Sequence, residues 1–176
     1  MFLQKAFQHT LLSLLLLCLC LYTGSCSSNH FRSNTPSQLD KKIAAFATND
    51  ISGKPIVFPQ AGTVTVIEFL SPHCASCARM TADLDRFWRC SDKNKFQVIG
   101  VVLDANQAQA VQLKRRKKVD FSWVVDEEFA VASRYQIKGV PSVFVIDQHG
   151  GIQFVADGSS GDSERITHTV RALLEE

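Results

Sequence analysis

The segment that most constrains the fold is residues 63–70, which read TVTVIEFL. This run is rich in β-branched residues and almost continuously apolar, so it lacks the alternation of a strand with one face in water. Strands of this kind are covered on both faces and are typical of α/β proteins. The segment therefore predicts a central strand with other elements packed above and below it.

The rest of the pattern supplies elements that could cover such a strand. The expected strands lie at residues 55–58, 96–103, 121–126, 142–147 and 152–156. The expected helices are an amphipathic one after the Ser-Pro break at residues 71–72 and three that cover 106–118, 127–135 and 163–174. The order βαβαβ, followed by a hairpin and a terminal helix, predicts an α/β sandwich in which helices cover both faces of a mixed sheet.

The first 25 residues are predicted to be a secretory signal peptide. Lys5 gives a basic start, residues 11–21 are apolar, and TGS precedes Cys26. An apolar run of this length is too short to cross a bilayer comfortably. The segment YTGSC resembles a bacterial lipoprotein cleavage box, although Thr23 replaces the usual leucine. Two outcomes stay open: acylation of Cys26, which would anchor the chain, or cleavage near Ser25, which would release it.

Either outcome places the remainder outside the cytoplasm, in the bacterial periplasm. Residues 26–37 are polar and are expected to form a flexible tether, followed by one domain at 38–176. The composition is ordinary for a globular protein, and a net charge of +2 gives no reason to expect a nucleic-acid partner. The basic run at 114–118 is interpreted as the solvated end of a helix, with an anionic partner site as the alternative.

Three cysteines remain in the predicted domain: Cys74, Cys77 and Cys90. A structural zinc site needs four ligands, and no second pair of cysteines or histidines is present, so we expect no metal. A bond between Cys74 and Cys77 would close too short a loop to constrain the unfolded chain much. Redox cycling is therefore the favoured chemistry. Cys90 is expected to be a small packing residue, with a role as a redox partner as the alternative.

Cys74 lies at a strand-to-helix junction, and the helix is expected to begin at or just after it. Unpaired amides and the positive end of the helix dipole favour a thiolate there. Cys77, nearly one turn further on, would face inward and could attack a mixed disulfide formed at Cys74. We therefore expect Cys74 to be the nucleophile and Cys77 the resolving cysteine. Their redox-active disulfide would serve without another cofactor.

Two ionisable neighbours are candidates for tuning this pair. Glu68 lies in the middle of the apolar strand, where burial would raise its pKa and make it a proton relay for Cys77. Alternatively, it points outward from an edge strand. His73 directly precedes the nucleophile; as a cation it would stabilise the thiolate, and otherwise it would only shape the surface met by partners.

The segments VIEFLSPHCASC and YQIKGVPSVFVIDQHGGI, with an amphipathic helix after the first, resemble the thioredoxin superfamily over residues 40–176. The interval from Cys77 to Pro141 leaves room for an extra strand-helix insert. This insert and the predicted export signal resemble the TlpA/ResA/DsbE branch of extracytoplasmic thiol-disulfide oxidoreductases. The resemblance implies a thioredoxin-like sandwich. It also implies a cis-proline loop at Val140 and Pro141 that faces the dithiol and binds an extended substrate. Glu68 matches the family's buried acid, which is usually Asp.

The chain also departs from that family. His73 replaces the tryptophan of thioredoxin, and Ala75 and Ser76 replace its Gly-Pro pair, so the direction of electron flow cannot be carried over. Ser71 lies three residues before Cys74, as in peroxiredoxins. However, Ile67 stands where that family has a proline, and peroxidase activity is not expected.

The favoured hypothesis is an exported disulfide reductase, because the resemblance is to the reducing branch and no inserted helical domain of the DsbA kind is present. The expected partners are exported cysteine-containing proteins and a membrane thiol electron donor, and we expect a monomer. The alternatives are a disulfide oxidase or isomerase, and a copper(I) carrier that uses both thiolates with His73 and Met80.

Overall fold

The structure is a computed structural model and describes residues 38–39, 41–158 and 161–176. The predicted signal peptide, Cys26 and the tether up to residue 37 lie outside the described residues and stay predictions. Within the described residues, none of the helices combines the length and the apolar character needed to cross a membrane.

The main sheet has five strands and is mixed. In spatial order they are β5 (Ser122–Val125), β4 (Phe96–Val102), β3 (Val64–Leu70), β6 (Ser142–Ile146) and β7 (Ile152–Ala156). The β3–β4 and β4–β5 pairs are parallel, whereas β3–β6 and β6–β7 are antiparallel. All seven residues of β3 are buried. The apolar run at 63–70 is therefore the central strand that its composition predicts.

Side chains of β3 enter two cores on opposite faces of the sheet. Val66 and Leu70 belong to one core and Ile67 and Phe69 to the other, as the alternation of a strand requires. By the same alternation, Glu68 faces the first core, which also contains Cys77.

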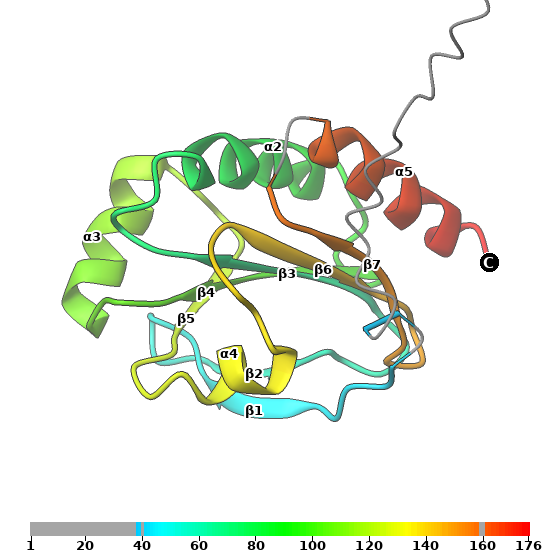
Figure 1. The fold of residues 1–176 in the computed structure, drawn as a ribbon. Helices are drawn as coiled ribbons and strands as arrows, with labels where there is room; N and C mark the ends of the chain where they lie inside the picture. Colours follow the sequence, from blue (N-terminus) through cyan, green and yellow to red (C-terminus); the bar gives the residue numbers. More distant parts are fainter. Residues whose placement is uncertain (1–37, 40, 159–160) are drawn as a thin grey trace, which may run out of the picture. The chain divides into compact units, whose positions relative to one another are not determined.

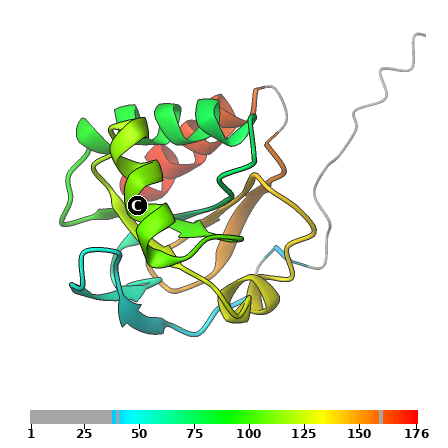
Figure 2. The same ribbon diagram turned by 90° about the vertical axis from the view of Figure 1, so that its left-hand side faces the viewer.

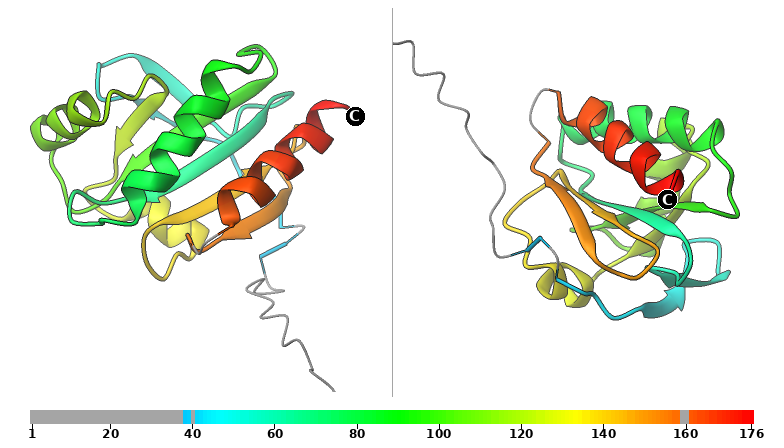
Figure 3. Two further views of the ribbon diagram at one scale, coloured as in Figure 1. Left: turned by 90° about the horizontal axis from the view of Figure 1, so that it is seen from above. Right: turned by 90° about the vertical axis from the view of Figure 1, so that its right-hand side faces the viewer.

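Helices α2 (Cys77–Arg89) and α5 (Asp162–Leu174) lie above the sheet in Figure 1 and pack into the first core. Figure 3 shows them side by side across that face. Below the sheet lie α4 (Ala130–Tyr135) and a separate hairpin, β1 (Phe46–Asn49) with β2 (Pro55–Phe58). The view in Figure 2 shows the same two layers. This is the thioredoxin-like sandwich that the sequence predicts.

Between β4 and β6 the chain forms α3 (Gln107–Lys117), β5 and α4, so the predicted additional strand-helix segment is present. A capping box begins α3: the Asn106 side chain accepts from the Gln109 amide, and the Gln109 side chain accepts from the Asn106 amide. Ala110 and Leu113 bury the inner side of α3 in the first core.

Residues 41–43 run beside the turn between β6 and β7. The Ile43 amide donates to the Gly150 carbonyl, the Ile152 amide donates to the Lys41 carbonyl, and Lys42 forms a bridge with Gly151. Because β6 is antiparallel to β3, this turn lies at the end of the sheet opposite to the carboxyl end of β3.

Candidate active site

The candidate site is the junction between β3 and α2. After Leu70 the chain turns at residues 72–73, and the Cys74 amide donates to the Ser71 carbonyl at 3.1 Å. The Ser71 hydroxyl accepts from the His73 amide at 3.3 Å. Helix α2 begins at Cys77 with Ser76 as its N-cap. The expectation that the helix begins at or just after Cys74 is therefore wrong, because these turn hydrogen bonds hold the chain out of the helix for three more residues.

Cys74 and Cys77 form a disulfide with an S–S distance of 2.04 Å and a Cα–Cα distance of 5.4 Å. Cys74 is partly exposed, whereas Cys77 is fully buried. The Cys77 amide donates to the Cys74 sulfur at 3.1 Å, and the Ser76 hydroxyl lies 3.5 Å from the same sulfur. The first amide of α2 is thus directed at Cys74, where it would stabilise a thiolate after reduction.

Glu68 does not point outward from an edge strand: it is fully buried in the central strand. Its register neighbours are Gly100 of β4 and Val143 of β6. The Thr81 hydroxyl lies 2.8 Å from one carboxyl oxygen, Oε1. The other oxygen, Oε2, has no hydrogen-bond partner among the described residues. Burial raises the pKa of Glu68 from its ordinary value of 4.5 to about 8.

Pro141 lies at the same end of the sheet as the dithiol. Its peptide bond with Val140 is cis, and it directly precedes β6. Because Ser142 pairs with Phe69, the next position in this antiparallel register places Pro141 beside Leu70, four residues before Cys74. Pro141 is buried, and Val140 is half-buried against both cores.

Two contacts of this site are not among the sequence predictions: those of Thr81 and Gly158. Thr81 lies four residues after Cys77, and the spacing of residues on one helix face could have identified it. No comparable pattern in the sequence identifies Gly158 as part of the site. A Cβ atom built on it would lie 2.2 Å from Cγ of Pro141, so the backbone of Gly158 packs directly against the proline ring.

Two other predicted residues, His73 and Cys90, are exposed to solvent. His73 is exposed beside the disulfide. Cys90 is a free thiol and is exposed at the C-cap of α2, so the expectation that it packs in the core is wrong. The reason is that α2 ends at Arg89, and the residue that caps it turns toward solvent.

The residues considered for a metal are not brought together. Met80 is buried in the first core, where its sulfur accepts a hydrogen bond from the Ser163 hydroxyl at 3.8 Å, whereas His73 is exposed. The part of the chain that the structure describes contains no group of three or more His, Cys, Asp or Glu residues placed to hold a metal ion.

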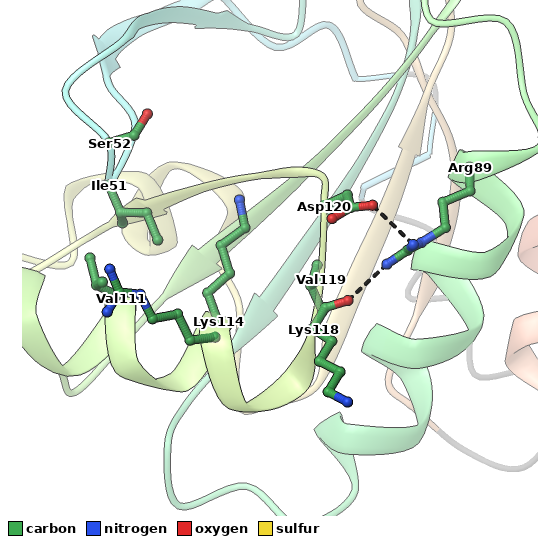
Figure 4. A pocket seen from close by; sticks show the side chains of 9 residues that line it. Ile51, Ser52, Arg89, Val111, Lys114, Lys118, Val119 and Asp120 are labelled. Atoms are coloured by element: carbon green, nitrogen blue, oxygen red, sulfur yellow. Dashed lines mark hydrogen bonds and ion pairs between the residues drawn. The ribbon is translucent and has the colours of Figure 1, made fainter.

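The basic run at 114–118 contributes to a separate cavity of about 650 Å³, drawn in Figure 4. Lys114 extends toward the side of the cavity formed by Ile51 and Ser52. Arg89, at the end of α2, is bonded to Asp120 at 3.0 Å and to the Lys118 carbonyl at 2.8 Å. Burial lowers the pKa of Lys114, against the opposing charge of Asp50. The disulfide does not line this cavity.

Comparison with known proteins identifies a matching family and similar thiol-disulfide oxidoreductases. Residues 39–155 match the AhpC/TSA family. The chain is 25% identical over 113 residues to Sporulation thiol-disulfide oxidoreductase A of Bacillus subtilis, covering 62% of this chain and 68% of that protein. It is 21% identical over 148 residues to Thiol-disulfide oxidoreductase ResA of Halalkalibacterium halodurans, covering 84% and 83%.

A solved structure supports the fold. A thiol:disulfide interchange protein of the thioredoxin family from Chlorobium tepidum superposes with a TM-score of 0.68 at 16% identity, covering 77% of this chain and 97% of that one.

Proposed function

Because this chain belongs to the AhpC/TSA family and is a thiol-disulfide oxidoreductase of thioredoxin fold, we propose that it reduces or exchanges disulfides in other exported proteins. The observation that carries this proposal is the asymmetry of the Cys74–Cys77 pair. The amide at the start of α2 is directed at the sulfur of Cys74, which is partly exposed, while Cys77 is fully buried.

In the reducing direction, the Cys74 thiolate attacks one sulfur of a substrate disulfide. A mixed disulfide forms, and the first substrate sulfur leaves as a thiolate. Cys77 then loses its proton and attacks the Cys74 sulfur. The Cys74–Cys77 bond forms, the second substrate sulfur leaves, and two electrons have passed to the substrate. A thiol donor reverses the same exchange on the protein; a membrane thiol carrier would fit an exported chain.

Glu68 is proposed as the proton relay for Cys77. The two side chains face the same core, and a carboxyl whose pKa is about 8 can accept and return a proton near neutral pH. The loop at Val140 and Pro141 is proposed to bind the substrate backbone beside Cys74. His73 is proposed to favour the thiolate from its exposed position next to the sulfur.

The leader and the processing sites remain proposals from the sequence. We propose that residues 1–25 direct export to the periplasm and that residues 26–37 tether the domain, through acylated Cys26 or as a released chain. We also propose that the protein acts as a monomer.

Reduction is the proposed direction, and a disulfide oxidase or isomerase is the alternative. The reduction potential of the Cys74–Cys77 couple against glutathione separates them. A value near that of thioredoxin, about −270 mV, supports the reductase, whereas a value near that of DsbA, about −120 mV, would reverse the assignment.

The proposed function is tested by insulin reduction in the presence of dithiothreitol. We expect Cys74→Ser to abolish turnover, and Cys77→Ser to accumulate a mixed disulfide with the substrate, detectable by mass spectrometry. The matched control is Cys90→Ser, which should keep the wild-type rate because this thiol lies at the other end of α2. Turnover that survives Cys74→Ser would contradict the proposal. Tight copper(I) binding without turnover would favour the carrier.

The role of Glu68 has its own test. We expect Glu68→Gln to slow resolution of the mixed disulfide at pH 7 by about 10²-fold or more, because the amide cannot accept the Cys77 proton. The pH dependence of resolution near pH 8 should also disappear. An unchanged rate and pH profile would remove Glu68 from the mechanism.

A further inference from the structure

The Thr81 hydroxyl lies between two oxygen atoms that both compete for its proton. Oγ1 of Thr81 is 2.7 Å from the Cys77 carbonyl oxygen and 2.8 Å from Oε1 of Glu68. Thr81 and Glu68 are both fully buried. A hydroxyl carries one proton and two lone pairs, so it can donate to only one of these oxygens at a time. Both oxygens can accept, and the hydroxyl proton is directed to the one that lacks another donor.

When Glu68 is protonated on Oε2, Oε1 stays an acceptor, and the Thr81 hydroxyl donates to it in a neutral hydrogen bond. When Glu68 is ionised, the same hydroxyl donates to Oε1 in a charge-assisted hydrogen bond. The Cys77 carbonyl keeps a donor in both cases, since it is also the i−4 acceptor of the Thr81 amide in α2. The carboxyl can thus change its protonation state while the heavy atoms of all three groups stay in place.

This contact also distinguishes the two oxygens of Glu68. Oε1 is bound by Thr81 in both states, while Oε2 has no partner among the described residues. We propose that Thr81 is a positioning residue for the dithiol reaction, whose hydroxyl holds Oε1 in both protonation states and leaves Oε2 to exchange the proton with Cys77. This inference rests on the proposed role of Glu68 as the proton relay.

The surroundings of Glu68 leave few other groups that could set its titration. Its neighbours on β4 and β6, Gly100 and Val143, do not titrate. From α5, Ile166 and Val170 enter the same core. From α2 come Thr81 and Cys77, the latter bonded to Cys74. The charge that reaches Glu68 from α3 belongs to Lys117 and favours the ionised carboxyl.

The expected effect of losing the hydroxyl follows from these two states. Without it, the protonated carboxyl loses a neutral hydrogen bond, and the carboxylate loses a charge-assisted one, which is roughly twice as strong. The ionised form is therefore penalised more, and the pKa of Glu68 rises further. The matched variants are Thr81→Val, which keeps the shape without the hydroxyl, and Thr81→Ser, which keeps the hydroxyl.

The experiment uses the full chain and two readouts. The first is the ¹³C NMR titration of the Glu68 carboxyl in the oxidised protein, assigned by comparison with Glu68→Gln. The second is the pH dependence of the rate at which Cys77 resolves a mixed disulfide on Cys74. We expect Thr81→Val to move both midpoints upward by about one pH unit, a tenfold loss of the ionised form, and Thr81→Ser to match the wild type.

Every other outcome contradicts either this inference or the proposed function. If Thr81→Val leaves the NMR midpoint unchanged or lowers it, or if Thr81→Ser moves it equally, the inference is overturned while turnover through Cys74 still stands. If the NMR midpoint moves and the resolution midpoint does not, the relay at Glu68 fails, and the positioning role fails with it. A wild-type protein without turnover would instead overturn the proposed function.

Discussion

At the scale of single residues, Gly158 meets two requirements at once. Its φ angle is +80°, which side chains rarely allow, and a Cβ atom would lie 2.2 Å from Cγ of Pro141. A flexible side chain could move away from such a contact, but a proline ring held in the backbone has little freedom to do so. Gly158 therefore lets the proline loop stay in its place beside the dithiol.

We expect Gly158→Ala to lower the free energy of unfolding by more than about 1 kcal/mol and to reduce the rate of insulin reduction. The matched control is Gly62→Ala. Gly62 has a similar φ angle of +76°, but no atom lies within 4 Å of the added Cβ, so this variant isolates the backbone cost. Urea unfolding and the insulin assay check both. Equal stability and equal rates in the two variants would show that the contact with Pro141 is unimportant.

Residue types and spacing revealed part of this site. The two cysteines and the acid in the apolar strand are visible in the sequence because each is unusual in its setting. The contact between Gly158 and Pro141 depends on how β7 returns beside β6, which no local pattern encodes. The prediction that Cys90 packs in the core is wrong, because helical spacing does not reveal that α2 ends at Arg89.

At the scale of elements, α4 is a six-residue helix that depends on a side chain outside it. The buried carboxylate of Asp126 accepts from the amides of Val131 and Ala132, at 3.1 and 2.8 Å. Phe129, the N-cap, has a φ angle of +54° and provides no side-chain cap. Asp126 therefore satisfies the first amides of the helix that precedes the Pro141 loop.

We expect Asp126→Ala to lower the free energy of unfolding by about 1–3 kcal/mol, because two buried amides lose their acceptor. Glu127→Ala is the control, since Glu127 is the adjacent residue and is exposed. Urea denaturation of the oxidised proteins measures the difference. A loss no larger than that of the control would mean that water or other groups satisfy these amides.

Element order was predictable, but several boundaries were not. The strand at 63–70 and the helix at 163–174 follow from composition and periodicity, and the structure has them within one residue. The helix expected from residue 127 begins only at Ala130, because the Asp126 side chain and the left-handed Phe129 delay it. Local hydrogen bonds of this kind set helix ends, and the hydrophobic pattern does not contain them.

At the scale of the whole molecule, Glu68 links stability to pH. The pKa of this carboxyl is about 8 in the folded chain, against an ordinary value of 4.5. Below pH 4.5 both the folded and the unfolded chain hold the proton, and the contribution to stability is complete. Between pH 4.5 and 8 only the folded chain holds it, so this contribution falls as the pH rises. Above pH 8 it no longer changes.

We expect the free energy of unfolding of the oxidised protein to contain a component that falls by about 1.4 kcal/mol per pH unit between pH 5 and pH 8. Glu68→Gln, which does not titrate, should lack this component. Urea denaturation at pH 5, 6.5 and 8 measures both proteins. Parallel curves for the wild type and Glu68→Gln would show that Glu68 ionises alike in the folded and unfolded chains.

The bonds between residues 41–43 and the turn after β6 have a consequence for how the domain would meet its two partners. Residues 41–43 lie at the end of the sheet opposite to the junction that carries Cys74. If the proposed anchor at Cys26 held the protein to a bilayer, a membrane reductant and an aqueous substrate would both have to reach the sulfur of Cys74. The tether proposed at residues 26–37 would then have to be long enough to bring this sulfur to the reductant, so shortening it should slow recharging.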